Sequence, residues 1–386
     1  QRLAQAIVDG NLPTPGSKPP DALHLPDVTL LLPTRRAARA LQDAFLTASG
    51  SRALLMPRIR PISEGEEELT LLSGLAGLTT LGTDVLDLPP AVSAIERTLT
   101  LMEFVLRWRK RLAADDPDEA SAGSNTPAQA AALASELSSL MDMVETEGVP
   151  FRDLENLVPE TYAAHWGRTV DFLQIVTHVW PDYLRNRGFE SAVGRRNALI
   201  SAEAARISTA GSNDPIIVAG VTGSIPATVT LMRAVANSPK GAIVLPALDL
   251  DLDDAGWEAV KDSPEHPQFG LRKLLDQLGV PRSDVKILPG SRATRHRTER
   301  MRFISEAMRP CATTEAWHDF TQKADTDKIK SGLTGLSLIE APSAPDEAEA
   351  VALILREAVE MPGRTAALVS PDRLLARRVA IRLQSW

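Results

Sequence analysis

The sequence contains a single cysteine, Cys311, among its 386 residues. One cysteine cannot form a disulfide within the chain, a CxxC zinc site or a four-cysteine iron–sulfur site. The six histidines are scattered and show neither HExxH nor HxxxH spacing. We therefore expect no metal site built from His and Cys, and no cofactor. The shortage of cysteine is typical of a reducing, cytoplasmic compartment.

Aromatic residues and long apolar runs are also scarce. An aromatic content of 4% argues against a surface that stacks many single-stranded bases. No apolar run approaches the roughly 20 residues of a membrane-spanning helix, and the polar N-terminal residues do not read as a signal peptide, so no membrane partner is expected. The net charge of -8 argues against non-specific nucleic-acid binding over the whole surface. It leaves room for one local basic channel.

A nucleotide-hydrolysing motor needs a phosphate-binding GxxxxGK[ST] loop, and the sequence has none. The nearest segment, Gly10 to Lys18, is followed by two prolines, which favours a surface connector. The apolar segment 215–220 ends in Ala219-Gly220 without the carboxylates that hold Mg²⁺ in such motors. The Gly-rich turn that follows it could hold a phosphate, but a tight turn is favoured.

A cluster of acids after the apolar segment 241–250 is the better magnesium candidate. It consists of Asp249, Asp251, Asp253 and Asp254. Without a phosphate loop, a solvated, turn-forming loop is the favoured interpretation. No GxSxG elbow or pair of acid and base carboxylates supports another catalytic class, so no catalytic residue is assigned.

The apolar periodicity changes along the chain. Strands are predicted at 28–32, 53–59, 215–220, 241–250, 284–288, 335–343 and 365–371. Helices are predicted at 1–10, 91–113, 128–148, 165–188 with a break at Pro181, 195–208, 225–239, 266–280, 295–310, 345–360 and 372–386. Residues 323–330 are interpreted as a loose charged segment.

This order predicts an α/β protein with a parallel sheet covered by helices on both faces. It also predicts a large all-helical insertion and the start of a second α/β lobe. The predicted segments are 1–64, the first part of the first lobe; 65–210, the insertion; 211–330, the second part of the first lobe; and 331–386, the start of the second lobe. Because the chain lacks an initiator Met and stops within a helical pattern, we expect a piece of a longer protein.

A basic elbow joins the first strand to the following helix, in the sequence VTLLLPTRRAARALQDAF at 28–45. Thr34 is placed to cap that helix. Arg35, Arg39 and Gln42 then share one face, since they are spaced by four and three residues. A helix N-terminus flanked by arginines favours an anion such as a phosphodiester.

A second interpretation of the same helix remains open. Its arginine face could be a solvated surface with an Arg39–Asp43 ion pair. Arginine in the first turn is unfavourable for the helix dipole, which points weakly to an external anion. The opposite face, with Ala38, Leu41 and Phe45, is expected to be buried.

Five long segments together resemble the AddB subunits of AddAB helicase–nucleases, in the form described as an inactivated superfamily 1 helicase. They are LLPTRRAARALQDAF, ALLMPRIRPISEGEEE, IIVAGVTGSIPATVTLMRAVA, HPQFGLRKLLDQLG and EAPSAPDEAEAVALILREAVEMPGRTAALVSPDRLLARRVAIRLQSW. The resemblance is weakest in the helical insertion. It implies a RecA-like helicase lobe with an insertion, followed by a second lobe.

The resemblance also implies roles for individual positions. Residues 34–38 are similar to the helicase motif that holds the DNA strand. The segment IIVAGVTGS is similar to the Mg²⁺-binding strand, with its acids replaced. The expected DNA-binding residues are Thr34, Arg35, Arg36, Arg39, Arg373 and Arg377. The expected degenerate nucleotide-site positions are Ala219, Gly220, Thr222, Gly223 and Ser224.

The function that the resemblance implies is a non-motor, DNA-guiding and partner-binding scaffold in double-strand-break resection and recombinational repair. Its expected partners are an AddA-like motor and nuclease subunit and DNA, both single-stranded and as a duplex end. The expected location is cytoplasmic and nucleoid-associated, and a nuclease domain is expected beyond Trp386. Two alternatives stay open: a functional NTPase whose phosphate loop precedes Gln1, and a protein-interaction scaffold without DNA contact.

Overall fold

The computed structural model describes residues 1–14, 22–50, 55–62, 88–115, 126–153, 172–209, 214–290, 295–323 and 325–386. The chain divides into two compact units. The first comprises residues 1–294 and 304–323, and the second comprises residues 295–303 and 324–386.

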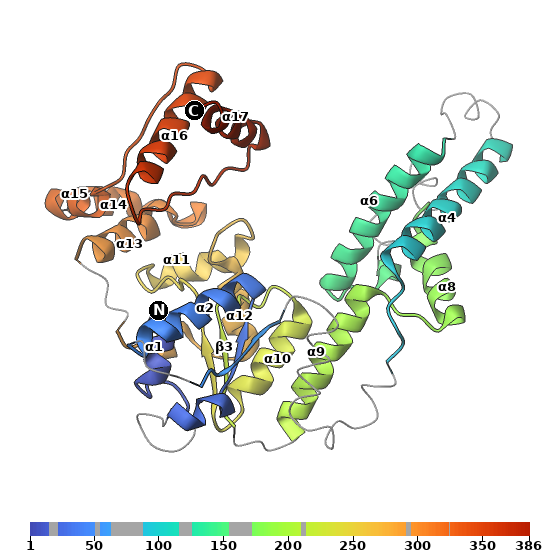
Figure 1. The fold of residues 1–386 in the computed structure, drawn as a ribbon, viewed down its shortest axis with the longest axis horizontal. Helices are drawn as coiled ribbons and strands as arrows, with labels where there is room; N and C mark the ends of the chain where they lie inside the picture. Colours follow the sequence, from blue (N-terminus) through green and yellow to red (C-terminus); the bar gives the residue numbers. More distant parts are fainter. Residues whose placement is uncertain are drawn as a thin grey trace. The chain divides into compact units, whose positions relative to one another are not determined.

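The first unit contains a four-stranded sheet in which every strand pair is parallel (Figure 1). Its strands are β1 (Thr29–Leu32), β2 (Arg58–Pro61), β3 (Ile216–Ala219) and β4 (Gly241–Val244), in the spatial order β2-β1-β3-β4. The predicted α/β class with a parallel sheet is confirmed.

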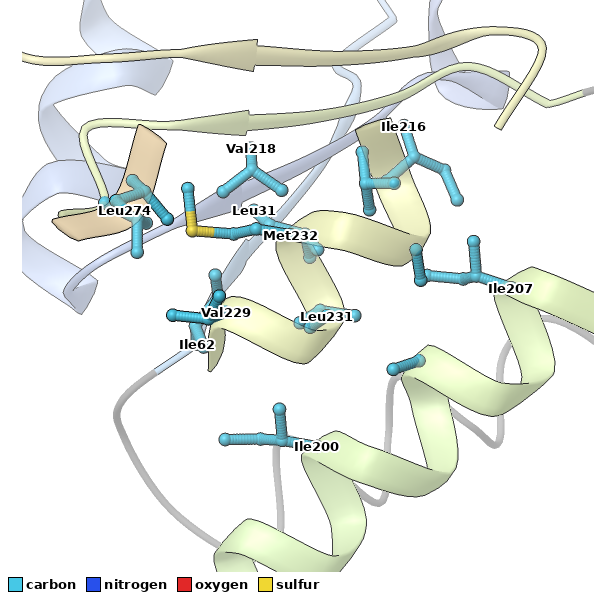
Figure 2. Packing of buried hydrophobic residues seen from close by; sticks show 14 of the residues in the cluster. Leu31, Ile62, Ile200, Ile207, Ile216, Val218, Val229, Leu231, Met232 and Leu274 are labelled. Atoms are coloured by element: carbon cyan, nitrogen blue, oxygen red, sulfur yellow. The ribbon is translucent and has the colours of Figure 1, made fainter. Parts of the chain in front are cut away.

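Side chains that alternate along the strands enter two separate apolar cores. Leu30, Leu32 and Ile217 face α1 (Arg2–Val8) and α2 (Arg35–Ala48). On the opposite face, the core includes residues of β1, β3, α9 (Ala192–Thr209), α10 (Pro226–Ala236) and α12 (Phe269–Leu278), as Figure 2 shows. Burial on both faces explains the continuous apolar run of these strands.

The strand order reverses between β1 and β3. The chain goes from β1 through α2 to β2 on one side, and from β3 through α10 to β4 on the other. In open parallel sheets, such a reversal leaves a crevice at the carboxyl ends of the two central strands, where ligands bind. The loops after β1 and β3 lie at these carboxyl ends.

Described residues between β2 and α9 form a helical bundle. It contains α4 (Ala94–Asp115), α6 (Pro127–Thr146), the π-helix η5 (Ile175–Val179) and α8 (Trp180–Arg187), packed around the fully buried Trp180. Pro181 lies in the first turn of α8, directly after η5, so the regular α-helix is interrupted near the predicted break while the helical chain continues. Proline lacks an N–H, and the wide π-turn just before it accommodates the interruption in hydrogen bonding. Residues 165–171 of the predicted helix lie outside the described residues.

The second unit consists, among its described residues, of helices joined by segments without regular structure. Its elements include α15 (Thr326–Leu333), α16 (Ala344–Glu360) and α17 (Arg373–Gln384). The prediction of a loose segment at 323–330 is wrong, because Asp325 caps α15 and its carboxylate accepts the Asp327 N–H. The predicted strands at 335–343 and 365–371 are also wrong, since neither segment pairs with a strand among the described residues. An apolar run becomes a strand only when a neighbour satisfies its backbone groups.

Two further strand predictions need correction. The segment 284–288 follows the 3-10 turn η7 (Arg282–Asp284) without joining the sheet. The strand predicted at 53–59 begins only at Arg58, after Pro57, whose missing N–H cannot join a ladder. The remaining short helices are η1 (Ala22–Asp27), α11 (Asp254–Ala259), η6 (Val260–Asp262), α13 (Arg295–Ala307), η8 (Cys311–Thr313) and α14 (Ala316–Lys323).

Candidate nucleic-acid interface

The N-terminus of α2 lies directly after β1, at the carboxyl edge of the sheet. Thr34 is its N-cap, with extended backbone, and the Thr34 Oγ1 accepts the Ala37 N–H at 3.1 Å. The predicted cap is thus confirmed. The first turn of α2 contains no acidic side chain. Its N–H groups and dipole therefore attract an anion without competition from an acid in the same turn.

The arginines of α2 face solvent. Arg35, Arg36 and Arg39 are all exposed. Within the described part of the chain, neither Arg36 nor Arg39 forms an ion pair, and the alternative pairing of Arg39 with Asp43 is not present. Two of these guanidinium groups therefore remain available to an external anion.

The opposite face of α2 anchors the helix to the sheet. Ala38, Leu41 and Phe45 are 8%, 7% and 0% exposed. All three belong to the core that contains Leu30 and Leu32 of β1. The predicted buried stripe is confirmed, and it fixes the side from which the arginines project.

The loop after β3 lies against the start of α2. Gly220, with a φ of 74°, donates its N–H to the Val244 carbonyl at 2.9 Å. A Cβ built on Gly220 would lie 3.7 Å from the Pro33 Cδ. The structure thus brings Pro33, which precedes the N-cap of α2, beside Gly220, one of the predicted degenerate nucleotide-site positions.

The rest of this loop combines a tight approach with exposed hydroxyls. Gly223 has a φ of 67°, and a Cβ there would lie 2.6 Å from the Leu274 Cδ1. Thr222 and Ser224 are exposed, while Ala219 is 3% exposed within the sheet. The loop is therefore a packed turn that presents hydroxyls and backbone rather than carboxylates.

The acidic loop after β4 is engaged in local structure. The Asp249 carboxylate accepts the N–H groups of Asp251 and Leu252 at 2.9 and 3.1 Å. Asp254 forms an ion pair with Arg282 at 3.2 Å. The geometry agrees with the favoured interpretation of a turn-forming loop.

Asp253 caps α11 and binds a buried arginine. Its carboxylate accepts the Gly256 N–H at 2.7 Å and pairs with Arg309 at 2.9 Å. These contacts hold the pKa of Asp253 below its usual value, and the hydrogen bond from Arg309 has the largest effect. Glu306 and Asp253 together raise the pKa of Arg309 further above its ordinary range.

Arg373 and Arg377, the other predicted DNA contacts, belong to the second unit. Both are exposed on α17, whose N-cap Asp372 accepts the Leu374 N–H at 2.7 Å. They therefore belong to a different unit from the α2 site.

Sequence reasoning missed two basic residues on the edge strand β2. Arg58 is exposed and Arg60 is half-buried, and they alternate with Ile59, which packs in the α2 core. The alternating RIR sequence between two prolines was the available signal, since period-two spacing places both arginines on one face.

Comparison of the chain with protein-family models finds no match, and comparison with curated protein sequences finds none. In the described ranges, no helix is both long and apolar enough to span a bilayer.

Proposed function

We propose that this chain is the helicase-like part of an AddB-type, non-motor subunit of a DNA-end resection complex. It holds a DNA strand by its phosphodiester backbone at the N-terminus of α2. The observation that carries the proposal is the exposed face of Arg35, Arg36 and Arg39 beside an acid-free helix N-terminus. This face begins where the strand order reverses, which is where parallel sheets bind ligands.

The architecture supports a RecA-like lobe with a helical insertion. The sheet is parallel and carries helices on both faces, and the bundle of α4, α6 and α8 separates β2 from β3 in the sequence. In the second unit, a segment without helix or paired strand precedes α16, and another precedes α17. The alternation of such segments with helices supports the start of a second lobe as part of this proposal.

The site chemistry supports a scaffold rather than a motor. β3 ends in Ala219 and Gly220, and the acids after β4 cap turns or bind arginines. A motor needs a free acidic pair beside its phosphates to hold Mg²⁺ and water. An AddA-like partner would supply ATP hydrolysis, and this chain would guide the strand.

One observation favours protein interaction as a second role. In the second unit, Leu338 and Val369 are 87% and 93% exposed. Exposed apolar side chains of this size mark interaction surfaces when they gather on one face. Partner binding is compatible with DNA guidance, and DNA crosslinking in the full complex separates the two roles.

One experiment measures binding of a fluorescent single-stranded oligonucleotide by anisotropy. A second measures ATP turnover with and without DNA. We expect weak, salt-sensitive binding and no DNA-stimulated hydrolysis. The double variant Arg36→Glu and Arg39→Glu should bind at least about tenfold more weakly, since each lost phosphate contact removes a charge-assisted interaction. The matched control, Lys110→Glu with Arg111→Glu on the exposed surface of α4, changes the net charge equally.

Equal losses in the two double variants would show that net charge, and not the α2 site, governs binding. Hydrolysis of ATP that rises with DNA would contradict the assignment as a non-motor subunit.

A further inference from the structure

The helical bundle and the sheet have separate apolar cores. The bundle core contains residues of α4, α6, η5 and α8 but no residue of α9. The α9 residues Leu199, Ile200, Ala204 and Ile207 instead belong to the core with α10 and the sheet. Figure 2 shows Ile200 and Ile207 directed toward that core. Among the described residues, the bundle and the sheet-bearing body therefore share no apolar core.

A polar junction joins the C-terminal end of α6 to the N-terminal end of α9. Ser191, which is 0% exposed, donates its hydroxyl to the Glu145 Oε2 at 2.7 Å. The same Ser191 Oγ accepts the Gly194 N–H at 2.8 Å and so caps α9. The Asn197 Nδ2 donates to the Glu145 carbonyl at 3.1 Å. We call these four residues the α6–α9 joint.

The joint fits closely at Gly194. A Cβ built there would lie 2.8 Å from both the Ser191 Oγ and the Glu190 Oε1. That spacing is shorter than real Cβ contacts allow, so a larger residue at position 194 would displace the Ser191 or Glu190 side chain. The joint is therefore a specific arrangement and not a loose solvated contact.

The two chain segments that enter and leave the bundle run together beside the joint. The Val92 N–H donates to the Glu190 carbonyl at 2.9 Å, and the Glu190 N–H donates to the Pro90 carbonyl at 3.0 Å. Arg195 Nη1 also donates to the Leu88 carbonyl at 2.8 Å. Residues 88–93 and 188–191 lie outside the helices, and hinges are built from a few such loop or element-terminal residues, which absorb the change in backbone angles.

We propose that the α6–α9 joint is a hinge on which the bundle of α4, α6 and α8 moves against the sheet-bearing body, closed by the hydrogen bond from Ser191 to Glu145. Polar interfaces between separately cored bodies permit such motion, because only a few hydrogen bonds must break. This inference is independent of DNA binding at α2.

The charge of Glu145 makes the hinge sensitive to pH. Burial raises the pKa of Glu145 above its ordinary value of 4.5, against the opposing effects of the Ser191 hydrogen bond and the charge of Arg97. The ionisable groups that face Glu145 are Arg97 on α4, Asp142 on α6, Glu190 before α9 and Arg196 on α9. The negative charges of Asp142 and Glu190 raise the pKa of Glu145 further, in the same direction as burial.

The direction of the pH effect follows from linkage. A closed joint with a raised Glu145 pKa binds a proton more tightly than an open joint, in which Glu145 is solvated. Acidification through the window between 4.5 and the raised value therefore favours the closed joint. Above that window, the buried negative charge of Glu145 destabilises the closed joint.

The test measures the distance between two spin labels by pulsed electron resonance in the full chain. Labels are attached at Ala132→Cys on α6 and Ala236→Cys on α10, both exposed, in a Cys311→Ser background. We expect the short, narrow distance component to grow as the pH falls from about 7.5 to about 5. Glu145→Gln keeps the hydrogen-bond acceptor without the charge, so it should hold the joint closed at both pH values.

Two further variants complete the design. Ser191→Ala removes the hydroxyl, and we expect about a tenfold rise in the open population from a lost hydrogen bond to a charged group. Glu136→Gln, an exposed residue on α6, should behave as the unmodified chain does. If Ser191→Ala does not fold, the Glu145→Gln comparison decides the matter. The proposal is overturned if the unmodified chain and Glu145→Gln give the same distance distribution and if that distribution does not change between the two pH values.

Discussion

Replacement of Gly223 by alanine is the sharpest test of how the loop after β3 is built. Gly223 has a φ of 67°, and a Cβ there would lie 2.6 Å from the Leu274 Cδ1 and 3.2 Å from the Val229 Cγ2. Leu274 is 0% exposed and Val229 is 4% exposed, so neither side chain can move into solvent. Gly223→Ala should therefore both strain the backbone and overpack the core.

The expected cost has two parts. A left-handed backbone costs a residue with a Cβ about 1–2 kcal/mol. Forcing an extra methyl group into a filled core costs roughly 1–3 kcal/mol more. The sum, about 2–5 kcal/mol, is a large fraction of the stability of an ordinary domain.

Native-state hydrogen exchange on peptides from β3 and α10 measures this loss locally, which avoids assuming that two units unfold together. Gly279→Ala is the matched control, because Gly279 has a φ of 69° with nothing within 4 Å of its Cβ. It should show the backbone cost alone. If Gly223→Ala costs no more than Gly279→Ala, the close packing of this loop against Leu274 is refuted.

Two smaller predictions concern a cap and a buried arginine. Thr34→Ala should lower the protection of the first turn of α2 by about 0.5–2 kcal/mol, because the Ala37 N–H loses its acceptor. Hydrogen exchange measures this protection, and undiminished protection would contradict the prediction. Arg309→Gln should shift acid unfolding to higher pH, measured by circular dichroism. The lowered pKa of Asp253 gives stability that is complete above its ordinary value of 3.8 and is lost as the pH falls through the lower folded-state value. An acid midpoint that does not move would show that Arg309 does not hold that pKa down.

Local sequence signals predicted the cap and the buried stripe of α2. The Thr34 cap depends on a hydrogen bond within one turn, and the stripe of Ala38, Leu41 and Phe45 depends on helical spacing alone. Both features are therefore visible in a short stretch of sequence. The positions of β1, β3 and β4 along the sequence were equally predictable from their apolar runs.

Pairwise features were not predictable in the same way. The contact between Pro33 and Gly220 and the bond between Ser191 and Glu145 join residues far apart in the sequence. Glu145 reads as a solvated residue of a polar helix until α9 is placed beside it. The segments 335–343 and 365–371 show the reverse error, because apolar alternation does not reveal whether a neighbouring strand exists.

The central claim, that α2 holds a polynucleotide by its phosphates, is tested most directly by the salt dependence of binding. The measurement is the slope of the logarithm of the association constant against the logarithm of salt concentration, for a single-stranded oligonucleotide. Loss of the two contacts in the Arg36→Glu and Arg39→Glu variant should reduce that slope by about 1.4. The Lys110→Glu and Arg111→Glu variant should leave it unchanged. An identical slope in the unmodified chain and the α2 variant would contradict the account.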